Sequence, residues 1–267
     1  MCARFGVSTS GFYTWKKREP SKRIEQDKLL LKQIRKIHRG NRKAYGSPRV
    51  YRALLAKGIT CSRRRVARVM REYGIKASVV GLYYRRPTKW DVYQQSDNIL
   101  GKVPMATERN EQWVADFTYI KTKEGWYYFA MVLDRYTRKL LGWSFSDTHN
   151  SNLTVAAFDM ATRKENGPRG LIFHTDRGIE YVSSQYQNKL REFDMISSMS
   201  RKGKCTDNAM AESFFHSLKT EKIHHKRYLR KLDAKKDILN YIQFYNHERL
   251  HSSLNYQSPV EYETLAE

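Results

Sequence analysis

Three acidic residues stand where metal-dependent chemistry on a phosphodiester could be done. Asp116 lies in the apolar run Val114–Thr118, and Asp176 follows the apolar run Leu171–His174. Glu212 falls on an expected helix, with 35 residues between it and Asp176. A charge flanked by apolar residues costs free energy unless it is paired or metal-bound. The three acids therefore predict a metal site built from distant parts of the chain.

Divalent magnesium explains why acids would be gathered in this way. Two Mg²⁺ ions can clamp the attacking and leaving oxygens of a phosphodiester during cleavage or strand transfer. Mg²⁺ prefers carboxylate oxygen and retains some of its waters, so a few acids suffice. Ordinary ion pairing with nearby Lys or Arg competes for any single acid and is a weak explanation for all three. We expect an enzyme that cuts and joins DNA.

The helix that carries Glu212 presents a polar face. Asn208, His216 and Lys219 are spaced four before, four after and seven after Glu212, so all four side chains share that face. This face can hold metal at Glu212 and a phosphate near Lys219. Asn208 is expected to cap or brace the helix, or to touch DNA.

Five further polar residues each have two interpretations. Asp134 could be a fourth metal ligand, although a structural acid at a strand end is favoured. His174 could act as a base, although a role in orienting Asp176 or in packing is favoured. Tyr181 and the pair Arg249 and His251 could contact DNA or tie the C-terminal helix to the core, and the tie is favoured.

The positive charge is concentrated at the N-terminal end. The net charge is +23, and residues 1–90 hold 25 Lys and Arg against 4 Asp and Glu. Such a block indicates a polyanion partner. A membrane surface would also attract it, but no apolar run approaches ~18 residues and no signal peptide opens the chain. Three scattered cysteines argue against a disulfide framework or zinc site and indicate a reducing cytoplasm.

Residues 1–18 are typical of the second half of a helix-turn-helix. Gly6 can end one helix and Ser8 can cap the next, in which Phe12 and Trp15 share a face. The alternative is a short basic helical tail.

A second, basic helix-turn-helix is predicted after Pro20. A long polar helix has an apolar stripe at Leu30, Ile34 and Ile37. Two capped helices follow, the first opened by Ser47 and Pro48 and closed by Gly58, the second opened by Ser62 and closed by Gly74. The core stripe of the second is expected at Val66, Val69, Met70 and Tyr73. Its basic side chains are left for phosphates or base edges, with a solvated arginine face as the alternative: Arg63, Arg64, Arg65, Arg68 and Arg71.

Residues 77–110 interleave aromatic and basic residues and predict an extended linker, with stacking on DNA as the alternative. Three antiparallel strands are then expected at 113–121, 126–134 and 140–146. The order continues as helix 152–163, strand 171–174, helix 183–193, strand 195–199, a helix from Thr206 past Lys219, and helix 235–246. This order predicts an α/β fold, a ribonuclease-H-like mixed-sheet core preceded by an all-α basic helix-turn-helix region. The expected domains are 1–19, 20–76, the linker 77–110, the catalytic core 111–225 and a helical extension 226–267.

The motifs resemble the second-frame (OrfB-type) transposases of the insertion sequence 3 family, within the DDE transposase and retroviral-integrase superfamily. The segments that carry the resemblance are Trp113–Ile120, His174–Gly178, Ser198–Gly203, Asp207–Phe215, Leu218–Glu221 and Tyr245–His251. The resemblance implies catalytic and metal-binding roles for Asp116, Asp176 and Glu212, and a DNA contact for Lys219. It also implies Mg²⁺ or Mn²⁺ and transposition of the encoding element, through a figure-eight and then a circle. The paired His and Cys spacings of the retroviral zinc module are missing.

The expected partners follow from this assignment. They are the element's terminal inverted repeats and target DNA, at least a second copy on DNA, and an upstream-frame (OrfA-type) protein or fusion, in the bacterial cytoplasm at the nucleoid. The expected DNA contacts are Lys219, Arg63, Arg64, Arg65, Arg68, Arg71, Lys202, Lys204 and Asn208. The rival hypotheses are a nuclease that hydrolyses without joining and a non-catalytic DNA-binding protein derived from a transposase. The basic helices argue against the first, and the three acids argue against the second.

Overall fold

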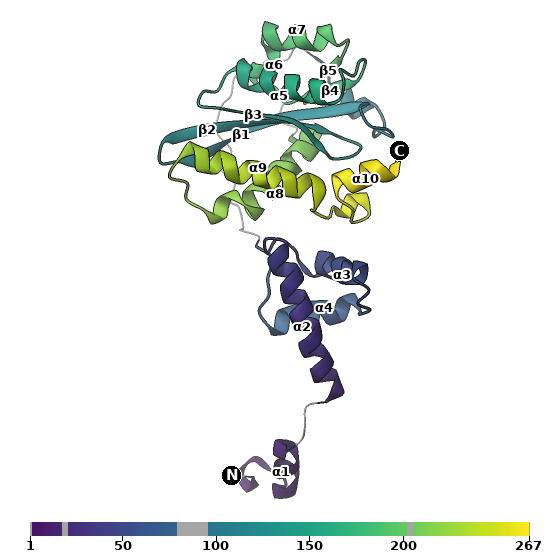
Figure 1. Ribbon diagram of the computed structural model, residues 1–267, viewed down its shortest axis with the longest axis vertical. Coiled ribbons are helices and arrows are strands. Elements are labelled where there is room, and N and C mark those ends of the chain that lie inside the picture. Colours follow the sequence, from purple (N-terminus) through teal and green to yellow (C-terminus); the bar gives the residue numbers. More distant parts are fainter. Residues whose placement is uncertain (1, 18–20, 79–95, 202–204, 267) are drawn as a thin grey trace. The chain divides into compact units, whose positions relative to one another are not determined.

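The chain forms two compact units, Met1–Ser78 and Val79–Glu267 (Figure 1). The computed structural model describes residues 2–17, 21–78, 96–201 and 205–266. Lys202, Lys204 and the aromatic and basic stretch of the expected linker from Tyr83 to Tyr93 lie outside these ranges. Across the described ranges, every helix is too short or too polar to cross a membrane.

The first unit begins with a short capped helix. A 3-10 turn, η1 (Ala3–Phe5), precedes α1 (Thr9–Lys17). Gly6 has φ +63° between them, the left-handed backbone that favours glycine at a helix end. The Gly11 amide donates to Ser8 Oγ at 3.0 Å, so the predicted cap is confirmed.

Three further helices pack around an aliphatic core. They are α2 (Lys22–Gly40), α3 (Ser47–Ala56) and α4 (Arg63–Glu72). The predicted stripe of α2 is buried, with Ile34 0% exposed, and Val66, Val69 and Met70 of α4 are buried with it. Ser62 accepts from the Arg65 amide, which confirms the predicted cap of α4.

Two details of these helices differ from expectation. Gly46, not Ser47, occupies the cap position of α3, so Ser47 and Pro48 both lie in its first turn. Tyr73 was expected in the core and is 44% exposed. Because α4 ends at Glu72, Tyr73 leaves the helical stripe, and its ring lies 5.9 Å below the Arg35 guanidinium instead.

The second unit is built on a five-stranded mixed sheet in the order β3-β2-β1-β4-β5. The strands are β1 (Gln112–Thr122), β2 (Gly125–Asp134), β3 (Leu140–Ser146), β4 (Ile172–Thr175) and β5 (Ile196–Met199). The predicted antiparallel pairing of the first three strands is confirmed, while β4 pairs parallel with both β1 and β5. Parallel neighbours need crossover connections, which are supplied by the helix between β3 and β4 and by the two helices between β4 and β5.

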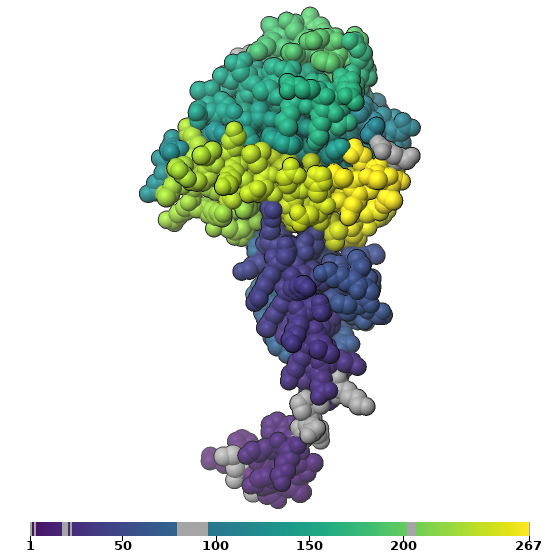
Figure 2. Space-filling view, in the orientation of Figure 1, coloured from purple at the N-terminus to yellow at the C-terminus, as the bar shows by residue number. Residues whose placement is uncertain are grey.

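Helices cover both faces of this sheet, with α5, α6 and α7 on one side and α8 and α9 on the other (Figure 1). Their bounds are α5 (Ser151–Lys164), α6 (Ile179–Val182), α7 (Ser184–Glu192), α8 (Ala209–Glu221), α9 (Lys231–His247) and α10 (Pro259–Ala266). Short 3-10 turns are η2 (Leu100–Lys102), η3 (Cys205–Asn208), η4 (Ile223–His225) and η5 (Ser252–Leu254). In the space-filling view the yellow-green atoms of α8 and α9 lie directly against the teal layer (Figure 2). The predicted mixed α/β fold is confirmed.

An aromatic core holds α5 and α7 against the sheet. Trp113, Phe158, Phe173 and Tyr186 are each at most 1% exposed and belong to one buried cluster. The Phe173 ring lies 6.2 Å from Trp113 and 5.4 Å from Phe158, edge or tilted, as aromatic pairs prefer. This packing sets the position of β1 and β4, the strands next to the acidic residues.

Candidate active site

The candidate site lies where β4 stops pairing with β1. The two strands pair only from Gln112 opposite Ile172 to Val114 opposite His174. Asp116 lies just beyond the paired part of β1, and Asp176 directly follows β4. Parallel strands bring their carboxyl ends to the same edge of a sheet, so the two acids meet although they are distant in sequence.

Asn208 brings the third acid to this edge. Its Nδ2 donates to the Ala115 carbonyl at 3.1 Å, and its side chain is 3% exposed. Asn208 therefore braces the start of α8 against β1, one residue before Asp116. Bracing the helix was one of the roles predicted for it. Glu212 lies in the first turn of α8. Asn208 itself makes no side-chain cap bond to the helix.

The three carboxylates interact electrostatically. Burial, followed by the charges of Asp176 and Glu212, holds the pKa of Asp116 well above its ordinary range. Burial raises the pKa of Asp176 to about 6, and the charges of Glu180 and Glu212 add to that rise. One oxygen of each aspartate accepts a backbone amide, from Phe117 at 2.8 Å and from Gly178 at 2.9 Å. These bonds orient the carboxylates but do not offset their mutual repulsion.

This donor set fits a hard divalent cation. Among the described residues, no three His, Cys, Asp or Glu side chains are arranged closely enough to form a ready-made metal site. The chemistry nevertheless suits Mg²⁺ or Mn²⁺, because carboxylate oxygens are the ligands that such ions prefer. A cation would also offset the repulsion between acids held in a poorly hydrated place, which is what the raised pKa values of Asp116 and Asp176 reflect.

Lys219 lies on α8, as Glu212 does, and close enough to Asp116 for their charges to interact. Its Nζ is 5.6 Å from the centre of the Tyr119 ring. Burial lowers the pKa of Lys219, and the charge of Asp116 opposes that shift. A cationic side chain thus stands near the acids, in the place expected for a group that contacts phosphate.

His174 is a packing residue in this structure. It is 0% exposed, with Nδ1 2.9 Å from Ser198 Oγ and Nε2 3.1 Å from Ser200 Oγ. Ser198 Oγ already accepts the amides of Ile99 and Leu100, so its proton points to Nδ1 and the histidine proton lies on Nε2. Burial lowers the pKa of His174 to about 4, so the ring is neutral near pH 7.

Asp134 has a structural place at the end of β2. Its Oδ2 accepts the amide and the hydroxyl of Thr137, both at 2.8 Å, and its Oδ1 accepts the Asn110 amide at 3.1 Å. It lies opposite Trp113, three residue pairs from Asp116 along the hairpin. That separation is about 10 Å at the usual strand rise. The favoured interpretation as a strand-end acid is supported, and Asp134 is not proposed as a metal ligand.

The expected tie between the core and the C-terminal helix is confirmed for one pair and wrong for one residue. Arg249 Nη2 lies 2.7 Å from Glu221 Oε1 at the end of α8, and His251 packs 4.6 Å from the Tyr245 ring of α9. Tyr181 instead packs in the α5 side of the core against Tyr186, at 5.2 Å between ring centres. It is 1% exposed, because α6 turns it inward, so it neither ties α9 nor faces DNA.

The arginines of α4 do not all face solvent. Arg65 Nε lies 2.7 Å and Arg68 Nη2 2.5 Å from the two carboxylate oxygens of Asp27 on α2, and Arg68 also pairs with Glu72 at 2.8 Å. Arg63, Arg64 and Arg71 are exposed, as the prediction of a DNA-facing set requires.

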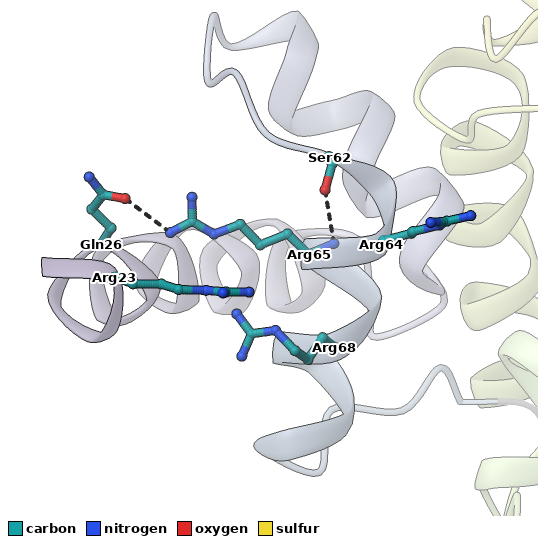
Figure 3. A pocket seen from close by; sticks show the side chains of 6 residues that line it. All are labelled: Arg23, Gln26, Ser62, Arg64, Arg65 and Arg68. Carbon is teal, nitrogen blue, oxygen red and sulfur yellow. Dashed lines mark hydrogen bonds between the residues drawn. The ribbon is translucent and has the colours of Figure 1, made fainter. Parts of the chain in front are cut away.

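Sequence reasoning missed Arg23, which joins this set. Arg23, Gln26, Ser62, Arg64, Arg65 and Arg68 line one hollow, and Figure 3 shows the guanidinium groups of Arg23 and Arg68 directed toward each other. The available signal was the position of Arg23 one helical turn before Asp27. A second missed cluster is Asp207, which accepts from Arg201 at 2.9 Å and Asn98 at 2.7 Å and whose pKa is lowered, chiefly by Arg201, to about 2.

Comparison with known protein families agrees with the two units. The integrase core domain matches residues 106–205 and again 194–259, and an HTH-like domain matches residues 25–82. A chain of the simian T-cell lymphotropic virus intasome, solved by cryo-electron microscopy, has a TM-score of 0.52 and 12% identity over 86% of this chain and 74% of that chain. That likeness supports the fold. The chain is therefore an integrase-core enzyme of the DDE polynucleotidyl transferase class with an HTH-like domain.

Sequence relatives narrow the class to a family. The 31 kDa protein of insertion element IS600 from Shigella sonnei is 37% identical over 97% of this chain and 96% of its own length. The transposase InsF of insertion sequence IS3A from Escherichia coli is 35% identical over 98% of this chain and 92% of its own length. The chain belongs to the IS3 family of insertion-sequence transposases, and its activity is DNA transposition.

Proposed function

We propose that Asp116, Asp176 and Glu212 are the catalytic acids of this transposase and that together they bind two Mg²⁺ ions, for which Mn²⁺ can substitute. The observation that carries the proposal is their meeting at the edge of β1 beyond β4, where the pKa values of Asp116 and Asp176 are raised. Carboxylates are seldom placed together in a poorly hydrated position unless a cation or proton is to be shared.

Each acid has a defined task in this scheme. The metals, when bound, activate a water or a 3′-hydroxyl and stabilise the leaving oxygen of the phosphodiester. Asp116 presents its carboxylate oxygens from within β1 and Asp176 from the residue after β4, and their backbone hydrogen bonds limit rotation. Glu212 approaches from α8, whose position depends on the bond from Asn208 to Ala115. Lys219 offers a positive charge to the phosphate of the bound strand.

The first unit provides the DNA-binding surface in this scheme. Arg63, Arg64 and Arg71 are exposed on α4, and Arg23 extends the same basic surface from α2. Asp27 holds Arg65 and Arg68 in place, which reduces the entropy that they lose on meeting a phosphate. We assign terminal inverted repeat DNA to this surface. Lys202 and Lys204 remain proposed contacts of the second unit.

The proposed domains divide DNA binding from catalysis. We propose a partial helix-turn-helix at 1–19, a basic helix-turn-helix DNA-binding domain at 20–76, a linker at 77–110, a catalytic core at 111–225 and a helical extension at 226–267. Transposition holds two element ends together, so at least a dimer is proposed on DNA, with an upstream-frame protein or fusion as a further partner. The site of action is the nucleoid in the bacterial cytoplasm. Nicking one strand and joining it beside the other end gives the figure-eight and then the circle.

Strand transfer on a labelled element end tests the assignment. Asp116→Asn, Asp176→Asn and Glu212→Gln should each abolish joined and nicked products under Mg²⁺ while DNA binding persists. Asp194→Asn is the matched control, since Asp194 pairs with Arg169 on the exposed surface, and it should retain wild-type joining. Wild-type joining by all three acid variants would refute the site. Hydrolysed ends without joined products from the wild-type protein would favour a nuclease.

A further inference from the structure

Glu180 is a buried acid for which the proposed catalytic scheme has no role. It lies in the short helix α6 and is 2% exposed. Among the described residues, neither of its carboxylate oxygens accepts a hydrogen bond. It does contact His149, whose Nε2 lies 2.9 Å from Glu180 Oε1 and which forms an ion pair with Glu180 when it is protonated. A buried carboxylate needs such compensation, so the contact with His149 determines where the Glu180 side chain rests.

Glu180 lies close to one of the proposed catalytic acids. A Cβ atom placed on Gly178 would stand 2.7 Å from Glu180 Oε2 and 3.0 Å from Asp176 Oδ1. The two carboxylates are therefore within about 6 Å of each other. Glu180 raises the pKa of Asp176 and His149 lowers it, so both groups act on this acid through their charge. Gly178 has φ −63°, so a larger residue there would meet no backbone strain, but the ends of the Glu180 and Asp176 side chains would have to shift.

His149 also contacts the strand that carries the other aspartate. Its ring lies 4.7 Å from the ring of Phe117 and 5.5 Å from that of Tyr128. Phe117 directly follows Asp116, and its amide donates to the Asp116 carboxylate at 2.8 Å. The His149 ring thus packs on Phe117 of β1, beside Asp116, and its Nε2 contacts Glu180, which lies near Asp176. It lies just before α5, so three separate segments meet at this ring.

From this arrangement we infer that His149 and Glu180 form a positioning pair, which sets the spacing of the Asp116 and Asp176 carboxylates and thereby the affinity for the divalent cation. The inference rests on the proposed metal site. It assigns neither residue to the cation itself. Outer-shell partners of metal ligands typically change affinity 10–100-fold when they are removed.

Direct Mn²⁺ binding to the full chain tests the pair, measured by the electron paramagnetic resonance signal of free Mn²⁺ and independent of DNA. His149→Phe keeps the ring packing on Phe117 and removes the contact with Glu180, so the Kd for Mn²⁺ should rise about 10-fold or more. Glu180→Gln is the milder change, since it keeps the side-chain shape, and it should weaken binding about threefold or more by removing a negative charge. In the Glu180→Gln background, His149→Phe should have a smaller effect, because no unpaired carboxylate is left behind.

Controls separate this inference from the proposed site. Asp194→Asn changes an exposed ion pair of similar length, 2.7 Å, and should leave the Kd for Mn²⁺ unchanged. If Asp116→Asn and Asp176→Asn abolish Mn²⁺ binding while His149→Phe and Glu180→Gln stay within twofold of wild type, the pair has no positioning role and the metal site stands. If Asp116→Asn and Asp176→Asn bind Mn²⁺ normally, both the proposed metal site and the positioning role of His149 and Glu180 are refuted. A lowered melting temperature with an unchanged Kd would show a purely structural contact and would also overturn the inference.

Discussion

Removing the Arg249 guanidinium should destabilise the second unit strongly. Arg249 Nη2 lies 2.7 Å from Glu221 Oε1, and its Nε lies 2.9 Å from Glu221 Oε2. The two side chains are 6% and 8% exposed. Tyr241 donates a further hydrogen bond to Glu221 Oε2 at 2.9 Å, and Arg249 also donates to Ser217 at 3.2 Å. This network joins the end of α9 to the last turns of α8, the helix that carries Glu212.

The expected magnitude follows from burial. Removing one partner of a buried ion pair leaves an uncompensated charge and typically costs about 3–5 kcal/mol. Arg249→Met keeps much of the side-chain volume, so the loss should reflect the charge and its hydrogen bonds rather than a cavity. For a unit of this size, 1 kcal/mol corresponds to roughly 2–4 °C, so the melting temperature should fall by about 6–20 °C.

Guanidinium denaturation followed by tryptophan fluorescence measures the effect, since Trp113, Trp126 and Trp143 all lie in the second unit. The double variant Arg249→Met/Glu221→Met is the informative control. It removes both charges, so it should be less destabilised than the sum of the two single variants by about 2 kcal/mol or more. A single-variant loss below about 1 kcal/mol, or strictly additive losses, would refute the claim that this buried pair stabilises the junction.

Three further predictions concern packing and pH. Gly142→Ala should destabilise by about 3 kcal/mol or more in chemical denaturation, because a Cβ there would lie 2.1 Å from the Ala157 carbonyl of α5; Gly40→Ala, which has open space, should not. His174 has a pKa of about 4 in the fold, below its ordinary 6.5, so its stabilising contribution is present above pH 6.5 and is lost as pH falls toward 4. The stability difference between wild type and His174→Gln should therefore shrink by about 3 kcal/mol across that window, and parallel pH profiles would contradict this. Asp176 has a raised pKa of about 6, so without metal its contribution to stability is present below pH 3.8 and lost as pH rises through 6; the Mn²⁺-induced rise in melting temperature should be large at pH 8 and fade below pH 6, and a shift independent of pH would count against Asp176 as a ligand.

Local signals in the sequence account for most of the secondary structure. The Ser8 and Ser62 caps, the buried stripe of α2 and the apolar runs of β1 and β2 depend on neighbours within a few residues. The order of strands and helices was enough to predict a mixed sheet with acids at its edge. Tyr73 and Tyr181 were placed wrongly, because each lies at a helix end where the local period no longer indicates which way the side chain points.

The sequence by itself determined which residues are acidic, which helices are basic and how the chain is cut into elements. The tertiary structure decided which of those residues meet. Asp27 pairs with Arg65 and Arg68, which are 38 and 41 residues away, and Asn208 reaches Ala115 across 93 residues. His149 and Glu180 carried no motif, yet folding places His149 against Phe117, the neighbour of Asp116, and Glu180 close to Asp176. Periodicity encodes burial within an element, whereas contacts between elements depend on how strands pair and helices cross, and no short stretch of sequence contains that information.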